Sequence, residues 1–289
     1  MKRALINCTG FIGDILFASS IAEKLQSEEQ FDKIDYNIQV HQPLELLSNN
    51  PFIDRIFIRG NGINEKDYNK IFTTPLVDQS KTPPRQFQEA CGVKNPTDSF
   101  KVYTNKSFDY SMKLMIEDAV KDNIPIIAYL ANWDERSYLF TKEQYKKGID
   151  VPNLGYGGAH RDIEYIINEL SKKYVLLKVG FPSGTNQFNT GLNTTATYSS
   201  TASLLKHCDY FIGAEGGLAN LASGVGTKTI ITGDFVHQLY GWNGVIKKIK
   251  EPKLGPKYYF KEGHITLDPY LTDKLVVDNI IKIVDEDNI

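Results

Sequence analysis

The stretch Asp209–Ile231, DYFIGAEGGLANLASGVGTKTII, contains the pattern that decides the fold. It opens on the short apolar run 210–212, which is typical of a buried strand and stops at Gly213. A turn without bulky side chains follows, and beyond it apolar residues recur at helical spacing from 218 to 225. A second apolar run, 229–231, ends the unit. The stretch therefore predicts a strand, a glycine turn, a helix and another strand.

The turn Gly216-Gly217 permits two interpretations. Glycine lets a backbone approach a ligand closely because it has no Cβ. The first amides of the following helix have no partner within the helix, and together with the helix dipole they favour an anion, typically a phosphate. The same residues equally suit a tight strand-to-helix turn that binds nothing, and glycine pairs alone do not separate the two.

The chain begins with a second unit of the same kind. Ala4–Ile6 is a short apolar strand, residues 7–14 form a glycine-containing loop, and apolar residues recur at helical spacing from 15 to 25. Asp14 lies at the start of this helix, where a carboxylate is a normal cap of the first turn. Strands and helices then continue to alternate along the chain.

Two regions of alternation, each with its own glycine turn, predict two doubly wound α/β domains. We place the first domain at 1–122 and the second at 123–270, and we expect 271–289 to form a final helix that packs back on the first domain. Further predicted strands are 36–40, 53–58, 67–73, 124–130 and 174–179, and further predicted helices are 44–47, 84–91, 108–120, 163–170, 202–207 and 271–284.

The composition is that of a soluble globular protein with ample material for a core. Of 289 residues, 41% are hydrophobic and 24% charged, and the formal net charge is -2. That charge argues against a protein coated with positive charge for nucleic-acid binding. The N-terminal apolar run is too short for a signal peptide, and no run approaches the roughly 20 apolar residues of a membrane span. We therefore expect a cytoplasmic protein.

Cysteine and histidine are not spaced as metal ligands. Cys8, Cys91 and Cys208 are far apart in the sequence, and we expect reduced, mostly buried thiols. The five histidines form no pair at ligand spacing, and no DxD-type carboxylate cluster is placed to hold a metal. We therefore expect neither a bound metal nor a resident cofactor.

Two motifs taken together resemble those of bacterial heptosyltransferases and their relatives, glycosyltransferase family nine. Residues 13–18, Gly-Asp-Ile-Leu-Phe-Ala, resemble the family signature Gly-Asp-(Ile/Val)-Leu-x-(Ala/Thr) near its start. Residues 213–228 resemble the second signature, Gly-x-Asp-Ser-Gly-Pro-x-His-Leu-Ala-x-Ala-Leu-Gly-Thr-Pro. The order and separation of the two fit the family, and the resemblance covers most of the chain loosely.

The resemblance implies the GT-B fold, in which two Rossmann-like domains face each other across a cleft. It also implies an inverting, metal-independent transfer of a sugar from a nucleotide-diphosphate sugar, held by the second domain, to an acceptor hydroxyl on the first. Such a reaction needs a general base to take the proton of the attacking hydroxyl. It also needs amides or cations that stabilise the leaving diphosphate.

The resemblance also implies roles for individual residues. Asp14 is the expected base, with a helix cap as the alternative, and it can be both. The residues expected at the donor are Glu215, Gly216, Gly217, Leu218, Asn220, Arg136, Gly180 and Phe181. The residues expected at the acceptor are Thr9, Gly10, Phe11 and Gly13. A solvated surface charge at Arg136 and a buried loop anchor at Phe181 are the simpler readings of those two side chains.

The second motif departs from the family at positions that contact the donor in relatives. Asp-Ser-Gly of the family becomes Glu215-Gly216-Gly217, and its His becomes Asn220. Glutamate keeps the charge but reaches further, whereas asparagine keeps a hydrogen bond and cannot become cationic. We therefore expect a donor other than ADP-heptose.

A lysine-rich stretch leaves the acceptor open. Residues 246–261, IKKIKEPKLGPKYYFK, combine six lysines with aromatic side chains, a composition that can follow a phosphate backbone and stack on a base. A solvated loop is the simpler interpretation. The acceptor is either a saccharide of lipopolysaccharide type or a hydroxymethylated base of bacteriophage DNA. For DNA, the contacting residues would be Lys247, Lys248, Lys250, Lys253, Lys257, Tyr258 and Tyr259.

Two other functions fit the same sequence. A sugar-nucleotide epimerase of this fold would turn over its donor without an acceptor. A catalytically silent module would bind a nucleotide sugar or a nucleic acid and leave its bonds intact.

Overall fold

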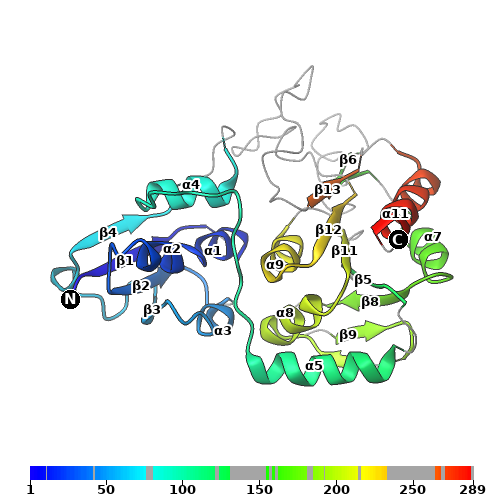
Figure 1. The fold of residues 1–289 in the computed structure, drawn as a ribbon, viewed down its shortest axis with the longest axis horizontal. Coiled ribbons are helices and arrows are strands. Elements are labelled where there is room, and N and C mark those ends of the chain that lie inside the picture. Colours follow the sequence, from blue (N-terminus) through cyan, green and yellow to red (C-terminus); the bar gives the residue numbers. More distant parts are fainter. Residues whose placement is uncertain are drawn as a thin grey trace, which may run out of the picture.

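The computed structural model contains two α/β units that lie side by side (Figure 1). One is built on a four-stranded sheet and the other on a seven-stranded sheet, with a separate two-stranded pair. The predicted α/β class with mainly parallel sheets is confirmed. The structure describes residues 1–10, 12–41, 43–75, 81–120, 124–130, 154–155, 158–159, 162–180, 185–191, 193–213, 216–232, 264–267 and 271–287.

The first sheet is entirely parallel and has the strand order β3-β2-β1-β4. Its apolar face, which includes Ile6 and Tyr36, packs into one core with the neighbouring helices, and the Tyr36 hydroxyl donates to Ala18 O at 2.7 Å. The strands are β1 (Arg3–Cys8), β2 (Lys33–Ile38), β3 (Arg55–Ile58) and β4 (Lys70–Thr73). The helices are α1 (Ile12–Ala18), α2 (Ile21–Ser27), α3 (Leu44–Leu47) and α4 (Pro83–Ala90), with a 3₁₀ turn η1 at Glu65–Asp67.

The other face of this sheet carries a fully buried carboxylate, Asp35. Its Oδ2 accepts hydrogen bonds from Arg3 Nη1 at 3.0 Å, Arg55 Nη2 at 2.7 Å and Tyr68 Oη at 2.9 Å. A buried carboxylate without such partners would be strongly destabilising. Because β3 and β4 are at opposite edges, their connection crosses this face, and Tyr68 fastens it to Asp35. Burial and the hydrogen bond to Asp35 raise the pKa of Tyr68 to about 12.

The second sheet has the order β10-β9-β8-β5-β11-β12-β13, in which β8, β5, β11, β12 and β13 run parallel. Its strands are β5 (Ile126–Leu130), β8 (Val175–Val179), β9 (Thr185–Phe188), β10 (Asn193–Thr195), β11 (Tyr210–Gly213), β12 (Lys228–Ile231) and β13 (His264–Thr266). The separate pair is β6 (Leu154–Gly155) and β7 (Gly158–Ala159). The helices are α5 (Lys106–Ala119), α7 (Ile163–Leu170), α8 (Tyr198–Lys206), α9 (Gly217–Val225) and α11 (Asp273–Asp287).

Helix α8 begins at Tyr198 rather than at the predicted 202. A capping box explains the earlier start, because Thr197 Oγ1 accepts from Ser200 N at 3.0 Å and Ser200 Oγ accepts from Thr197 N at 2.9 Å. The first turn is rich in serine and threonine, so apolar periodicity alone does not reveal it. The antiparallel hairpin β9–β10 also went unpredicted, since its polar sequence does not alternate.

Two helices lie elsewhere than the predicted domain limits suggest. Helix α5 precedes residue 122 but packs on α8, where Asp109 pairs with Lys206. Helix α11 shares its buried face with α7 and the second sheet, and not with the first domain, where we had expected it. Its end is fastened there by the Tyr210 hydroxyl, which donates to Asp287 Oδ2 at 2.6 Å.

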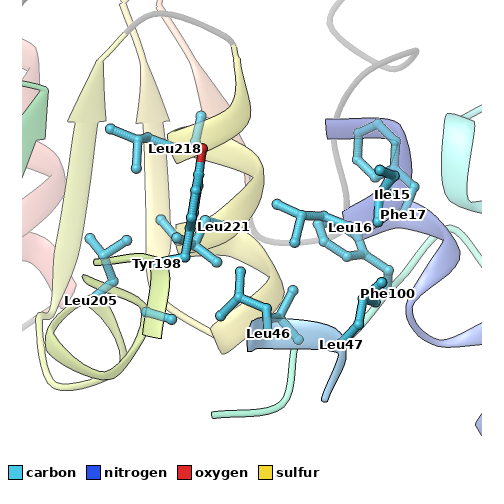
Figure 2. Packing of buried hydrophobic residues seen from close by; sticks show 14 of the residues in the cluster. Ile15, Leu16, Phe17, Leu46, Leu47, Phe100, Tyr198, Leu205, Leu218 and Leu221 are labelled. Atoms are coloured by element: carbon cyan, nitrogen blue, oxygen red, sulfur yellow. The ribbon is translucent and has the colours of Figure 1, made fainter. Parts of the chain in front are cut away.

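One apolar core runs from the first domain into the second. Leu16 of α1 and Leu46 of α3 belong to the same buried cluster as Tyr198 of α8 and Leu221 of α9 (Figure 2). A charged hydrogen bond reinforces the contact, because Glu45 Oε1 of α3 accepts from the Tyr198 backbone amide at 2.9 Å. The helices of the two domains are therefore packed directly against each other.

The segment that leads from the first domain toward α5 lies on α9. Val102 N donates to Gly224 O at 2.8 Å, although Gly224 is inside the helix. A Cβ on Gly224 would lie 2.5 Å from Val102 Cγ2 and 2.8 Å from Phe100 Cε2. The segment approaches this closely because the position has no side chain.

Gly224→Ala is expected to lower the free energy of unfolding by about 1–3 kcal/mol, the usual effect of overpacking. Without a clash, alanine inside a helix is about 1 kcal/mol better than glycine, so the contact with Val102 decides the sign. Urea unfolding measures the change. In the double variant Gly224→Ala/Val102→Ala, part of the clash is removed and the combined loss should be smaller than the sum of the single losses. Strict additivity would contradict this packing.

Candidate functional site

The two glycine-containing turns meet at the boundary between the domains. A Cβ placed on Gly13, in the first turn of α1, would lie 2.9 Å from Asn220 Nδ2 on α9. A Cβ on Gly217 would lie 3.8 Å from Ile12 Cγ2. The first turns of α1 and α9 are therefore in contact, and each follows the carboxyl end of a parallel strand, β1 or β11.

Asn220 reaches from α9 toward the first domain. It is 5% exposed, and its backbone amide donates to Gly216 O at 2.9 Å in the first turn of α9. Its side-chain amide occupies the space that the side chain of any residue larger than glycine at position 13 would need. This pair brings residues predicted for the acceptor side and for the donor side into one place.

Gly216 has a backbone conformation that only glycine adopts readily. Its φ of 153° and ψ of -172° lie in a region that is essentially closed to other residues. No atom of the described residues lies within 4 Å of an ideal Cβ built on it, so those residues leave the space beside it open. Gly216 is the N-cap of α9 and has no side chain with which to cap the helix. The first amides of α9 and the helix dipole therefore favour an anion at this turn.

Asp14 lies in the first turn of α1 and folds back over Gly10. Its Oδ2 would be only 2.2 Å from a Cβ on Gly10, whose φ is +96°. Glycine is thus required at position 10 both by the backbone and by the carboxylate that lies over it. The half-buried Asp14 carboxylate is placed at the amino end of α1, where it suits a cap as well as a base.

The strand that leads to Asp14 is held firmly, and its cysteine is not reactive. Thr9 N donates to Thr74 Oγ1 at 2.9 Å, and Thr9 Oγ1 donates to Thr74 O at 2.9 Å, which ties the first loop to the end of β4. Burial raises the pKa of the Cys8 thiol well above its ordinary value, and the charges of Cys91 and Asp14 act in the same direction. Cys8 therefore stays a neutral thiol and is neither nucleophile nor base.

Of the remaining predicted residues, two are described by the structure and the rest are not. The Leu218 side chain is 7% exposed and belongs to the core, so only its backbone amide faces the turn. Gly180 directly follows β8 at the carboxyl edge of the second sheet. The others lie outside the described residues: Phe11, Arg136, Phe181, Glu215, Lys247, Lys248, Lys250, Lys253, Lys257, Tyr258 and Tyr259.

Two absences concern only the part of the chain that the structure describes. No group of three or more His, Cys, Asp or Glu side chains is arranged there to hold a metal ion. None of the helices in that part combines the length and the apolarity needed to cross a membrane.

Sequence reasoning missed two residues that join the domains through α3 and α8, Glu45 and Tyr198. Tyr198 is 8% exposed, and Glu45 caps the amide with which α8 begins. The sequence did contain a signal that α8 begins at Tyr198, because Thr197 is followed three residues later by Ser200, the spacing of a capping box. Its partner Glu45 is 153 residues away, and no local pattern predicts that pairing.

Comparison with known proteins places this fold. No family model matches the sequence, and no curated protein matches it. Among solved structures, a glycosyl transferase of family 9 from Veillonella parvula has a TM-score of 0.58 at 12% identity and covers 97% of this chain and 89% of that one. The E. coli ADP-heptose LPS heptosyltransferase II has a TM-score of 0.52 at 13% identity, over 100% of both chains.

A third structural relative was solved with nucleotides. The E. coli heptosyltransferase WaaC with ADP has a TM-score of 0.51 at 11% identity over 98% of both chains. With ADP-2-deoxy-2-fluoro heptose the score is 0.50 at 10% identity over 99% of both. These likenesses show the class of fold, that of the GT-B glycosyltransferases. Within it, the relatives found are heptosyltransferases and other family-nine enzymes, as the two motifs predicted.

Gly10→Ala is expected to destabilise the protein more than Gly191→Ala does. Both glycines have a φ of +96°, but within the described part of the chain no atom lies within 4 Å of a Cβ on Gly191, whereas the Cβ on Gly10 collides with Asp14. The left-handed backbone alone should lower the free energy of unfolding by about 1–2 kcal/mol in each variant. Gly10→Ala should lose at least about 1 kcal/mol more. Equal losses in urea unfolding would show that Asp14 does not lie over Gly10.

Proposed function

We propose that this chain is an inverting, metal-independent glycosyltransferase that moves a sugar from a nucleotide-diphosphate sugar to an acceptor hydroxyl. The observation that carries the proposal is the contact between Gly13 and Asn220, which sets the turn holding Asp14 against the turn opened by Gly216. A carboxylate and an anion-favouring helix start are the two groups that this reaction needs. The fold shared with glycosyltransferases supports the same reaction class.

The donor diphosphate is assigned to the start of α9. Gly216 leaves open space beside its backbone, and the amides of Gly217 and Leu218 begin the helix. As the bond between the anomeric carbon and the phosphate oxygen breaks, negative charge grows on the diphosphate, and these fixed donors stabilise it without rearrangement. Asn220, in the same turn, adds a neutral side-chain amide at the boundary with the first domain. A donor other than ADP-heptose fits the substitution of Asn for His at this position.

The acceptor is assigned to the first domain, beside Asp14. The Asp14 carboxylate takes the proton of the acceptor hydroxyl while that oxygen attacks the anomeric carbon from the side opposite the diphosphate. One carbon–oxygen bond forms as the other breaks, so the anomeric configuration inverts. Cys8 does not compete as a base, because its thiol stays protonated. The bonds between Thr9 and Thr74 hold the loop that precedes Asp14.

Asp14→Asn is expected to lower kcat by about 10²–10⁴-fold, the usual contribution of a general base. The measurement is the release of nucleoside diphosphate from sugar nucleotides, after a thermal-shift screen has found the nucleotide that raises the unfolding midpoint. The same nucleotide should still stabilise the variant, because the donor turn is unchanged. Asp118→Asn, at an exposed aspartate of α5, is the matched control and should keep the rate. Full activity of Asp14→Asn would exclude the proposed role.

Treatment with EDTA is expected to leave the rate of donor turnover unchanged, because amides and side chains of α9 hold the leaving group. The assay compares the untreated enzyme, the EDTA-treated enzyme and the treated enzyme resupplied with Mg²⁺ or Mn²⁺. A loss of activity that Mg²⁺ or Mn²⁺ restores would contradict metal independence and leave the sugar transfer itself standing.

The acceptor is tested in two arms, an oligosaccharide of lipopolysaccharide type and DNA containing hydroxymethylated bases. Transfer to either identifies the acceptor class, and NMR of the product reports whether the anomeric configuration has inverted. Donor turnover that yields an isomeric sugar nucleotide without any acceptor would instead indicate an epimerase. Tight donor binding without product in every arm would indicate a binding module.

A further inference from the structure

Four side chains form a row across one face of the first sheet, near its carboxyl end. Asn7 of β1 is in register with Asn37 of β2 on one side and with Thr73 of β4 on the other, and Asn37 is in register with Phe57 of β3. Side chains in register on neighbouring strands lie on the same face of a sheet. This polar row of Phe57, Asn37, Asn7 and Thr73 therefore spans all four strands with an aromatic ring, two amides and a hydroxyl.

The polar row lies on the face opposite the helices of the first domain. Ile6 and Tyr36 belong to the other face, where α1, α2, α3 and α4 contribute to the same core. In the row, the Thr73 side chain is exposed, and those of Asn7 and Phe57 are half-buried. The row thus keeps polar side chains accessible within a parallel sheet, whose two faces are normally both covered.

The two amides of the row are held in fixed orientations, and donors are left over for a ligand. Asn37 Nδ2 donates to Asn7 Oδ1 at 2.9 Å, and Asn37 Oδ1 accepts from Gly60 N at 2.8 Å. In the described part of the chain, the Asn7 Nδ2 amide and the Thr73 hydroxyl donate to no other group. An amide and a hydroxyl in neighbouring strands can therefore pair with adjacent hydroxyl groups of a ligand.

The row itself carries no charge, and the cation that touches it is already paired. The Arg55 guanidinium lies over the Phe57 ring, 5.3 Å from its centroid, and donates to the buried carboxylate of Asp35 at 2.7 Å. Nucleic acids are bound chiefly through cations that contact their phosphates. A neutral row of amides, a hydroxyl and an apolar ring instead matches a saccharide, which combines hydroxyl groups with apolar C–H groups.

The row lies directly behind the loop that carries the proposed base. Thr9 follows Asn7 by two residues, which is about 7 Å along a strand, and both its amide and its hydroxyl are bound to Thr74. Beyond Thr9, the Asp14 carboxylate folds back over Gly10. A saccharide with one hydroxyl at Asp14 therefore reaches the row by continuing across the ends of β1 and β4.

We propose that the polar row binds a neutral sugar unit of the acceptor, next to the unit whose hydroxyl attacks the donor. This inference rests on the proposed function and names its acceptor as a saccharide, held by residues outside both sequence motifs. Asn7 and Thr73 exchange hydrogen bonds with hydroxyl groups of that unit, and the Phe57 ring contacts its C–H groups.

The double variant Asn7→Asp/Thr73→Val removes both donors and keeps the shape of the row. An aspartate at position 7 still accepts from Asn37 Nδ2, and valine keeps the β-branched shape that suits β4, so the fold should persist. Because hydrogen bonds from both positions are lost, affinity for a saccharide should fall at least about 10-fold. Saturation-transfer NMR titrations of the full chain with maltotriose, cellotriose, mannotriose and triacetylchitotriose measure the affinity, and a short single-stranded DNA forms a second arm.

Asn168→Asp is the matched control, because it makes the same change from amide to carboxylate at an exposed position of α7, in the second domain. It should bind the saccharide as the wild type does. A loss of affinity confined to the double variant supports the proposal. Equal affinity of the double variant and the wild type overturns it, as does a wild type that binds none of the saccharides, or a loss in the double variant of DNA binding instead.

The proposed function is tested separately in the same proteins. Thermal shifts with ADP, GDP, UDP, CDP and dTDP should be equal in the wild type and the double variant, because the turn at Gly216 is unchanged. A wild type that binds none of these nucleotides would refute the proposed function. A wild type that binds a nucleotide but no saccharide would refute the polar row alone.

Discussion

The contact between α1 and α9 is the constraint on which the rest of the site depends. Asn220 can lie against Gly13 only because that position has no Cβ. Farther along α9, Gly224 admits the segment at Val102 in the same way. The first half of the chain therefore contacts α9 near both of its ends. At each contact a glycine without a side chain sets how closely the two segments approach. The separation between Asp14 and the open turn at Gly216 follows from these two close approaches.

Local sequence was enough to predict the two glycine units and several other elements. The strand at 210–212 and the helix at 163–170 appear in the structure as β11 and α7, because an apolar run or an apolar stripe is visible within a few neighbouring residues. The turn at Gly216 was also recognised as a place where the backbone can be approached closely, and Gly13 was singled out as part of the first motif. What they approach is not readable from the sequence: the position of Asn220 beside Gly13 requires the packing of two domains.

Features that depend on distant partners escaped prediction for the same reason. The start of β2 was missed because Asp35 looks like a surface residue, and only Arg3, Arg55 and Tyr68 make its burial tolerable. The first turn of α8 was missed because its signal lies in a cap and not in apolar periodicity. Tyr198 consequently escaped notice, although it belongs to the same buried cluster as Leu218 and Leu221 of α9.

The amino and carboxyl ends of the second sheet differ in how their polar groups are engaged. At the amino end of the second sheet, the Tyr210 hydroxyl donates to Asp287, and Lys228 pairs with the same carboxylate. These bonds lower the pKa of Asp287, with Lys228 as the largest cause. At the carboxyl end, no atom of the described residues lies within 4 Å of a Cβ on Gly216. Ligands of such sheets bind at the carboxyl ends of the strands, and the glycine turn at Gly216 that precedes α9 lies at that edge.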